Sequence, residues 1–275
     1  MDLNQQALDI HKKYKGKITT SLRDTDEMTR EKLSLYYSPG VGAVSSEIAK
    51  HPETLREYTW TNNLVAVISD GSAVLGLGDI GAKGAMPVME GKALLFKHFA
   101  NIDSVPIVLD VHTPNEIVET IKAMAPSFGA INLEDIAAPK CFEIEERLKA
   151  GLDIPVFHDD QHGTAVVVLA GLINAMKVVN KNLGDCKIAM VGAGAAGTAI
   201  AKLLHQYAQP EIIIVDSKAI ISRNRTDLNE EKKILLDFSN PNNVDGTLED
   251  TILDADIFIG VSKAELLTEA MVKSM

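Results

Sequence analysis

Short apolar runs, each closed by a polar residue or a glycine, recur along most of this chain of 275 residues. Such runs are typical of strands that are buried on both faces of a parallel sheet. We expect strands at 64–69, 105–110, 130–133, 156–158, 187–191, 211–215 and 256–260.

Helical spacing of apolar residues separates several of these runs. Ile117, Val118 and Ile121 mark one face of a helix at 114–124, so 105–133 indicates a parallel strand–helix–strand unit. We expect further helices at 3–14, 92–99, 163–180, 195–207, 230–238 and from 263 onward. The chain is therefore predicted to be an α/β protein with two lobes. Residues 1–160 form an N-terminal α/β lobe with parallel strands, and residues 161–275 form a Rossmann-type doubly wound lobe that is incomplete at its C-terminal end.

Composition narrows the class of protein. The 38 acidic residues outnumber the 27 Lys and Arg residues, and the net charge of −11 argues against a nucleic-acid partner. The two cysteines, Cys141 and Cys186, lie far apart and indicate a reducing compartment. No run reaches the roughly 20 apolar residues of a membrane span, and the polar start lacks a secretory signal. We expect a soluble, cytoplasmic protein without a membrane partner.

A glycine-rich segment, Gly192-Ala193-Gly194-Ala195-Ala196-Gly197, lies between an expected strand and an expected helix. In this context the first glycine permits a tight turn, the second lets a pyrophosphate approach the backbone, and the third allows close packing of helix and strand. The alternative is a structural Gly/Ala turn without a ligand. We predict that Gly192, Gly194, Ala195, Ala196 and Gly197 bind a dinucleotide.

Asp216 ends the next expected strand, where an acidic residue can accept hydrogen bonds from the adenine ribose. Its carboxylate would repel a 2′-phosphate and so favours NAD over NADP. The nearby Lys218 opposes that preference.

Two carboxylate pairs, Glu134-Asp135 and Asp159-Asp160, directly follow expected strands. Oxygen ligands without a cysteine favour a hard cation, Mg²⁺ or Mn²⁺. Two alternatives remain open: Asp160 could cap the helix after Gly163, and His158 with His162 could bind zinc.

Two other residues in the first lobe are candidates for proton transfer. Tyr37 stands with Tyr36 before a Pro-Gly turn, where tyrosines can equally be packing groups. The glycines at 76–81 indicate a loop. Lys92 is either a solvated residue at a helix start or a partly desolvated base with a lowered pKa.

Taken together, the motifs at 37–41, 75–81, 87–92, 132–135, 157–165 and 192–197 resemble those of malic enzymes, specifically the short bacterial and archaeal type. The resemblance extends from about Lys15 to the end of the chain. It implies a tyrosine general acid, a lysine general base, three metal ligands, a supporting acid and a dinucleotide site. The matching residues are, in that order, Tyr37; Lys92; Glu134, Asp135 and Asp160; Asp159; and Gly192 to Gly197 with Asp216.

The resemblance also implies an activity, the oxidative decarboxylation of malate to pyruvate and CO₂ with reduction of NAD, and it suggests a homodimer. A malolactic enzyme and a catalytically inert dinucleotide-binding protein are the alternatives. The sequence departs from the larger malic enzymes in having Ala73 where they have a substrate-binding arginine, and Lys83 is a candidate replacement. Family members continue past the position of Met275 with Asn-containing motifs, so we expect weak or no turnover from residues 1–275 alone.

Overall fold

The computed structural model describes residues 2–74 and 76–275. Leu75, the first residue of the glycine-rich motif at 75–81, therefore lies outside the described residues. The chain divides into two compact units. The first contains the residues up to Ile136 together with Ile144–Phe157, and the second contains Ala137–Glu143 together with His158–Met275.

A four-stranded sheet forms the centre of the first unit, in the order β2-β1-β3-β4. Its strands are β1 (Leu64–Ser69), β2 (Asp103–Val108), β3 (Ala130–Leu133) and β4 (Val156–His158). β1 pairs in parallel with both neighbours, so that Ile68 lies opposite Ile107 of β2 and Leu133 of β3. Because helices cover the sheet, these strands carry the continuous apolar runs that parallel sheets need.

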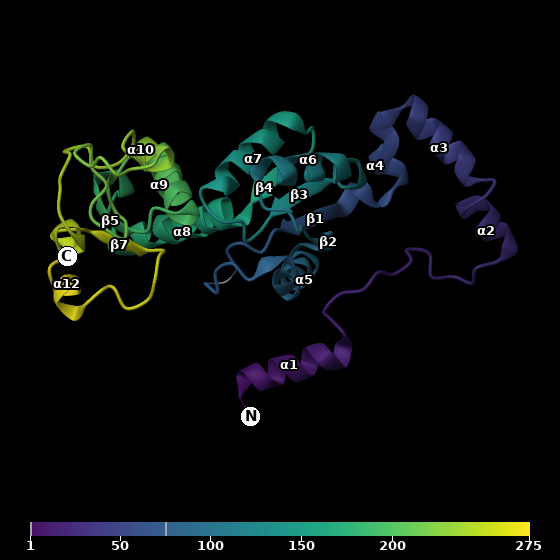
Figure 1. Ribbon diagram of the computed structural model, residues 1–275, viewed down its shortest axis with the longest axis horizontal. Coiled ribbons are helices and arrows are strands. Elements are labelled where there is room, and N and C mark those ends of the chain that lie inside the picture. Colours follow the sequence, from purple (N-terminus) through teal and green to yellow (C-terminus); the bar gives the residue numbers. More distant parts are fainter. Residues whose placement is uncertain (1, 75) are drawn as a thin grey trace. The chain divides into compact units, whose positions relative to one another are not determined.

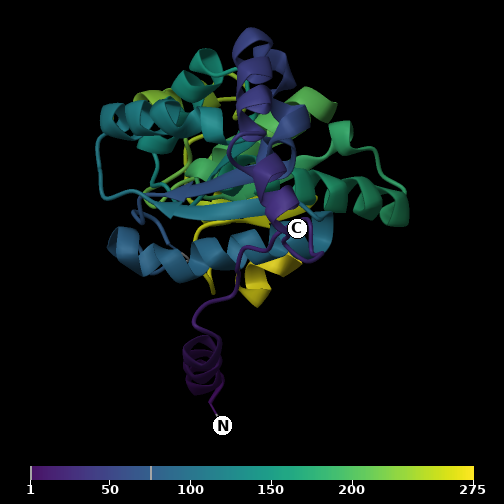
Figure 2. The same cartoon turned by 90° about the vertical axis from the view of Figure 1, so that its right-hand side faces the viewer.

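Helices lie on both faces of this sheet, with α5 (Gly81–Ala100) on one face and α6 (Pro114–Met124) on the other (Figures 1 and 2). α6 begins at a capping box in which Thr113 and Glu116 exchange hydrogen bonds, and its buried face is Ile117, Val118 and Ile121 as expected. α7 (Lys140–Gly151) precedes β4 in the chain.

The segment before β1 consists of short helices and turns that lie outside the sheet. It contains α1 (Leu3–Tyr14), α2 (Arg30–Tyr36), α3 (Val41–Lys50) and α4 (Leu55–Tyr58), with 3₁₀ turns at Pro52–Thr54 and Trp60–Asn63. Not one residue of 2–60 is buried. The apolar periodicity predicted α1, but α2 and α3 were missed.

The second unit contains a parallel three-stranded sheet in the order β6-β5-β7. The strands are β5 (Lys187–Val191), β6 (Glu211–Val215) and β7 (Ile257–Gly260). A core that includes Ile188, Ile200 and Leu204 joins the sheet to α8 (Asp159–Val179), α9 (Ala195–Ala208) and α10 (Glu230–Leu235). A smaller cluster with Ile252 and Met271 covers the other face through α11 (Leu248–Ile252) and α12 (Glu269–Lys273).

The α/β class and all the expected strands are confirmed, but several helix predictions were wrong. α5 spans Gly81–Ala100 rather than 92–99, although it contains Pro87 and two internal glycines. Burial of Ala82, Ala85, Met89 and Ala93 on one side of α5 outweighs the poor helix propensity of the proline and the glycines. α8 begins four residues before the expected start, and α12 begins at Glu269 rather than at 263. The remaining 3₁₀ turns are Ala125–Ser127 and Leu183–Asp185.

α8 also corrects the expectation that no segment is long and apolar enough to span a membrane. This helix of 21 residues contains an 18-residue window with a mean hydropathy of 1.6, so it passes that test by length and composition. Its first turn carries Asp159 and Asp160, and Val168, Leu169 and Leu172 pack against the core of the second unit. Only 6% of that window is buried, and Val166, Val167 and Val178 are exposed, so α8 has an exposed apolar surface beside its packed side. Both cysteines are buried free thiols.

Candidate active site and dinucleotide pocket

Two carboxylates follow the last residue of β3 in the first unit. Glu134 and Asp135 are both buried, with 6% and 5% of their surface exposed. Asp135 adopts a left-handed backbone conformation with φ of 53°, so the alternation of strand side chains ends there. Asn132 Nδ2 donates a hydrogen bond to Glu134 Oε2 at 2.9 Å and fixes that carboxylate. The expectation that both acids can face one ion requires such a break in the strand.

Lys92 lies in the middle of α5, not at a helix start, which excludes the interpretation as a solvated first-turn residue. Its Nζ is 3.1 Å from Glu134 Oε1, and only 19% of its side chain is exposed. The structure therefore brings together two residues that lie 42 positions apart in the sequence.

The proposed general acid and the candidate substrate anchor are placed differently. Tyr37 directly follows α2 and is 74% exposed. In the described residues, no hydrogen bond or ion pair joins its side chain to Lys92 or to the carboxylates. Lys83 lies nine positions before Lys92 on the same helix, which places the two on opposite sides of it. Lys83 therefore receives no support as a partner of the Lys92 site.

In the second unit, Asp159 and Asp160 form the first turn of α8. The N-cap residue is His158, so the suggestion that Asp160 caps this helix was wrong. His158 is fully buried at the end of β4, and its Nε2 lies 3.2 Å from Asp160 Oδ2.

Gln161 fixes the other side of the His158 ring, because its Nε2 lies 2.8 Å from Nδ1. The two ring nitrogens therefore lie close to two different side chains, Nδ1 to Gln161 and Nε2 to Asp160. This arrangement favours a positioning role for His158 over the zinc alternative. The convergence of Asp160 with Glu134 and Asp135 stays a prediction.

The glycine-rich segment connects β5 to α9 as expected. Gly192 has a φ of +116°, and a Cβ on Gly197 would lie 1.8 Å from the carbonyl oxygen of Gly192. Gly194 is the N-cap of α9 without a side-chain cap, and nothing lies within 4 Å of the position of its missing Cβ. The segment therefore leaves helix amides open to a ligand, as a pyrophosphate site requires.

A pocket of about 770 Å³ opens beside this segment within the second unit. Gly192 and Gly194 line it, whereas Ala195, Ala196 and Gly197 lie on the first turn of α9 and are not among the lining residues. Asp216, at the end of β6, also lines the pocket. The size and the lining fit a dinucleotide.

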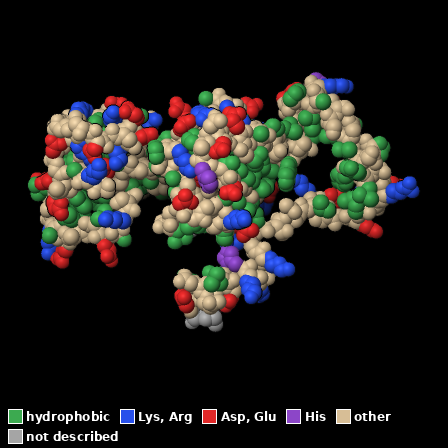
Figure 3. Space-filling view, viewed as in Figure 1, with side chains coloured by type: hydrophobic (Ala, Val, Ile, Leu, Met, Phe, Trp, Pro, Cys, Tyr) green, Lys and Arg blue, Asp and Glu red, His purple; other side chains and the backbone are tan. Residues whose placement is uncertain are grey.

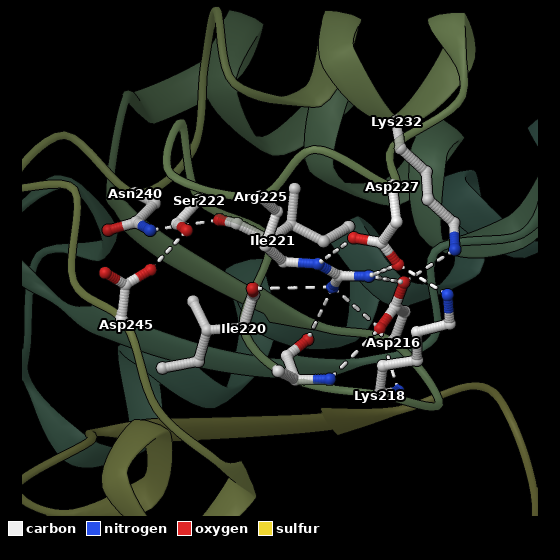
Figure 4. Close-up of polar contacts among 11 residues, drawn as sticks. Asp216, Lys218, Ile220, Ile221, Ser222, Arg225, Asp227, Lys232, Asn240 and Asp245 are labelled. Atoms are coloured by element: carbon white, nitrogen blue, oxygen red, sulfur yellow. Dashed lines mark hydrogen bonds and ion pairs between the residues drawn. The ribbon is translucent and has the colours of Figure 1, made fainter.

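Asp216 is held by cations, as Figure 4 shows. Arg225 Nη1 and Nη2 donate to its two oxygens at 2.9 and 3.1 Å, and Lys232 Nζ donates to Oδ2 at 2.6 Å. The amides of Lys218 and Ala219 donate to Oδ1. Burial alone would raise the pKa of this carboxyl, but the hydrogen bonds from Arg225, Lys232 and the amides outweigh it and hold the pKa well below its usual range.

The sequence interpretation missed four residues that support these sites, namely Asn132, Gln161, Arg225 and Lys232. Arg225 and Lys232 belong to the polar stretch after β6, where no strand-end position or motif spacing marks them. The one usable signal is Asn229, whose side chain caps the helix that carries Lys232.

The fold and the glycine-rich pocket define a two-unit α/β protein with a dinucleotide-binding unit. The model of the malic enzyme N-terminal domain matches residues 15–149, and that of the malic enzyme NAD-binding domain matches residues 161–275. The chain belongs to the malic enzyme family, and its second unit carries the NAD-binding domain of that family.

Named relatives agree with this assignment. A bifunctional malic/malolactic enzyme of Bacillus subtilis is 50% identical over 276 residues, which cover 100% of this chain and 67% of that protein. An NAD-dependent malic enzyme of Geobacillus stearothermophilus is 53% identical over 94% of this chain and 54% of its own length. An NADP-dependent malic enzyme of Escherichia coli is 46% identical over 99% of this chain and 36% of its own length. The chain thus spans about one third to two thirds of the length of these curated relatives.

Solved structures confirm the fold. An NAD-dependent malic enzyme from Thermotoga maritima superposes with a TM-score of 0.94 at 48% identity, over 98% of this chain and 72% of that one. A malic enzyme from Pyrococcus horikoshii gives a TM-score of 0.95 at 44% identity, over 100% and 66%. The resemblance read from the sequence motifs is confirmed.

Proposed function

We propose that the protein catalyses the oxidative decarboxylation of malate to pyruvate and CO₂ with reduction of NAD. Residues 1–160 would hold substrate and metal, and residues 161–275 would bind NAD. The observation that carries the proposal is the contact of 3.1 Å between Lys92 Nζ and Glu134 Oε1, beside the second buried carboxylate of Asp135. A base and carboxylate ligands side by side are what oxidation of a hydroxyl group at a metal requires.

The donor set fits a hard divalent cation, because Glu134 and Asp135 offer carboxylate oxygens where the strand alternation ends. We propose that Glu134, Asp135 and Asp160 hold Mg²⁺ or Mn²⁺ and that Asp159 supports them. The contact between His158 and Asp160 at 3.2 Å supports this, since metal-binding carboxylates are commonly positioned by a neighbouring donor.

Two residues of this chain would move protons. When bound, the cation polarises the C2 oxygen of malate and NAD accepts a hydride from C2. Lys92 Nζ takes the proton of the C2 hydroxyl group. After the C4 carboxylate leaves as CO₂, the Tyr37 hydroxyl gives a proton to C3, and pyruvate results.

The malolactic reaction is the second candidate, because the printed name of the relative from Bacillus subtilis includes it. In that reaction the reduced cofactor stays bound and lactate leaves. Free NADH and pyruvate in the product mixture support the proposed reaction, and lactate without free NADH supports the alternative.

The direct test is a malate-dependent NAD⁺ reduction assay with Mn²⁺. Lys92→Ala should lower the rate by about 10²–10⁴-fold, because it removes a general base. Lys97→Ala is the matched control, since Lys97 lies on the same helix and pairs with Asp103 on the surface. A measurable wild-type rate that Lys92→Ala leaves unchanged would overturn the proposal.

We also propose a cytoplasmic homodimer. No residue of 2–60 is buried, and α2 and α3 carry exposed apolar side chains, namely Leu33, Leu35, Tyr36 and Val44. Figure 3 shows hydrophobic side chains gathered over this part of the chain. Such a surface is typical of an interface. Analytical ultracentrifugation should give twice the mass of the chain, and a monomer at micromolar concentration would contradict the proposal.

A further inference from the structure

The two polar atoms of the Asn132 side chain differ in their surroundings. Asn132 lies on β3 and is only 2% exposed. Its amide nitrogen donates to Glu134 Oε2 at 2.9 Å, whereas its amide oxygen Oδ1 is buried and accepts no hydrogen bond among the described residues. A buried acceptor without a partner lowers the stability of the fold, because folding removes its hydrogen bonds to water. Packing alone therefore does not explain this amide.

Glu134 explains the orientation of the Asn132 amide. An ionised carboxylate only accepts hydrogen bonds, so Nδ2 faces it and Oδ1 faces away. The other carboxylate oxygen, Glu134 Oε1, lies 3.1 Å from Lys92 Nζ. The hydrogen bond from Asn132 to Oε2 thus keeps Oε1 turned toward the lysine.

A comparable contact precedes the proposed ligand of the second unit. His158 is the last residue of β4 and is fully buried. Its Nε2 lies 3.2 Å from Oδ2 of Asp160, which follows two positions later. Gln161 Nε2 lies 2.8 Å from Nδ1 of the same ring, and Gln161 is only 6% exposed. The ring is therefore held at one nitrogen and contacts the carboxylate with the other.

Asn240 shows the contacts of a buried asparagine whose role is structural. It is fully buried in the second unit, and its Nδ2 donates to the carbonyl oxygens of Ile221 and Val244. Its Oδ1 accepts a hydrogen bond from the amide of Val244. Asn240 therefore bonds to the backbone through both polar atoms, whereas the Asn132 amide bonds to a carboxylate through one of them.

We propose that Asn132 and His158 are positioning residues for the divalent cation. Each lies two positions before a carboxylate, Glu134 or Asp160, and orients that carboxylate before the ion binds. The inference rests on the proposed metal site and deepens it by two residues that act through the ligands. A carboxylate that is already fixed loses less conformational entropy when the ion binds, so loss of either contact should weaken the cation more than the fold.

Titration of the full chain with Mn²⁺, followed by electron paramagnetic resonance, tests the role of Asn132 together with urea unfolding. Asn132→Leu keeps the approximate size of the side chain and removes both the hydrogen bond and the unpartnered oxygen. We expect at least tenfold weaker binding of Mn²⁺.

Asn240→Leu is the matched control. It should leave the affinity for Mn²⁺ within twofold of wild type. It should also lower the urea midpoint more than Asn132→Leu does, because it deprives three backbone groups of their partners.

His158→Phe tests the second unit, because it removes both ring nitrogens and keeps a planar ring. We expect at least fivefold weaker binding of Mn²⁺, and His158→Gln, which restores a side-chain amide, should bind Mn²⁺ more tightly than His158→Phe. His205→Phe is the control, since His205 lies on α9 and its ring contacts Phe238. The affinity for 5′-AMP should stay within twofold in all three variants, which shows that the second unit is folded.

Binding of Mn²⁺ that Asn132→Leu and His158→Phe both leave within twofold of wild type would overturn the inference and leave the proposed metal site intact. Equal weakening of Mn²⁺ by Asn132→Leu and Asn240→Leu would also overturn it, since a general loss of stability would then explain both. If His158→Phe does not fold, Asn132→Leu decides. A wild-type chain that binds no Mn²⁺ would contradict the metal site itself, and with it the proposed function.

Discussion

Glu134 and Asp216 both lie at the end of a strand, in two different sheets. Each directly follows a parallel strand, β3 or β6, and each accepts a contact from a lysine that lies elsewhere in the chain. Their surroundings differ. Glu134 is followed by a second buried carboxylate, Asp135, whereas Asp216 is surrounded by Arg225, Lys232 and two backbone amides.

This difference shows that the position of an acid at a strand end does not by itself determine which kind of ion binds there. A pair of acids favours a cation, and an acid enclosed by cations can adjoin an anion. The first arrangement suits a divalent metal, whereas in the second Arg225 and Lys232 already neutralise the carboxylate. The deciding neighbour in the first unit is Asp135, the next residue of the chain, whereas in the second unit Arg225 and Lys232 come from the segment after β6.

The largest expected effect concerns Tyr37, the general acid that we propose for the reaction at the site around Glu134. Tyr37→Phe should slow the exchange of the C3 protons of pyruvate in D₂O by about 10²–10⁴-fold, because it removes the general acid. Tyr36→Phe is the control, since the Tyr36 hydroxyl donates to Asp24 instead. The measurement is the loss of the pyruvate methyl signal by NMR. Unchanged exchange in Tyr37→Phe would assign the proton to another group.

A smaller effect concerns stability and separates the buried ion pair of the Asp216 cluster from its exposed one. Arg225→Met should lower the free energy of unfolding by about 3 kcal/mol, because it leaves the buried Asp216 carboxylate without its bidentate partner. Lys218→Met should cost about 1 kcal/mol or less, because its pair with Asp227 is exposed. Urea unfolding of both variants checks this. Equal losses would mean that Arg225 carries no special share of the second unit's stability.

The smallest effect is a dependence on acid. The pKa of Asp216 is lowered on folding, so its contribution is complete above its unfolded pKa near 3.8 and is lost as pH falls through the folded pKa. Between pH 5 and 3 the stability of the wild type should fall more steeply than that of Asp216→Asn, by up to about 1.4 kcal/mol per pH unit. Urea unfolding across this range measures both slopes, and parallel slopes would contradict the assignment.

Much of the fold could be predicted because buried parallel strands have a strong local signature. The expected strands and α6 formed, since their apolar runs and capping residues act locally. α5 was misjudged because the burial of Ala85 and Met89 decides its length, and burial is a property of the whole unit. α2 and α3 were missed although neither they nor α1 contains a buried residue, so burial does not explain why only α1 was expected.

The candidate residues were found through motif order, whereas the contacts between them were not. The pairing of Lys92 with Glu134 and the enclosure of Asp216 by Arg225 join positions whose spacing has no period. Only the folded chain fixes such contacts. For the same reason, the preference for NAD inferred from Asp216 did not take into account the hydrogen bonds that this carboxylate accepts from Arg225 and Lys232 in the folded chain.

The central claim is that Glu134, Asp135 and Asp160 bind a single divalent cation. Titration of the chain with Mn²⁺, followed by electron paramagnetic resonance, tests it through Glu134→Gln, Asp135→Asn and Asp160→Asn, with the exposed Asp153→Asn as control. We expect one site in the wild type and in the control, and at least tenfold weaker binding in each of the three variants. Binding of Mn²⁺ that Asp160→Asn leaves unchanged would contradict the account.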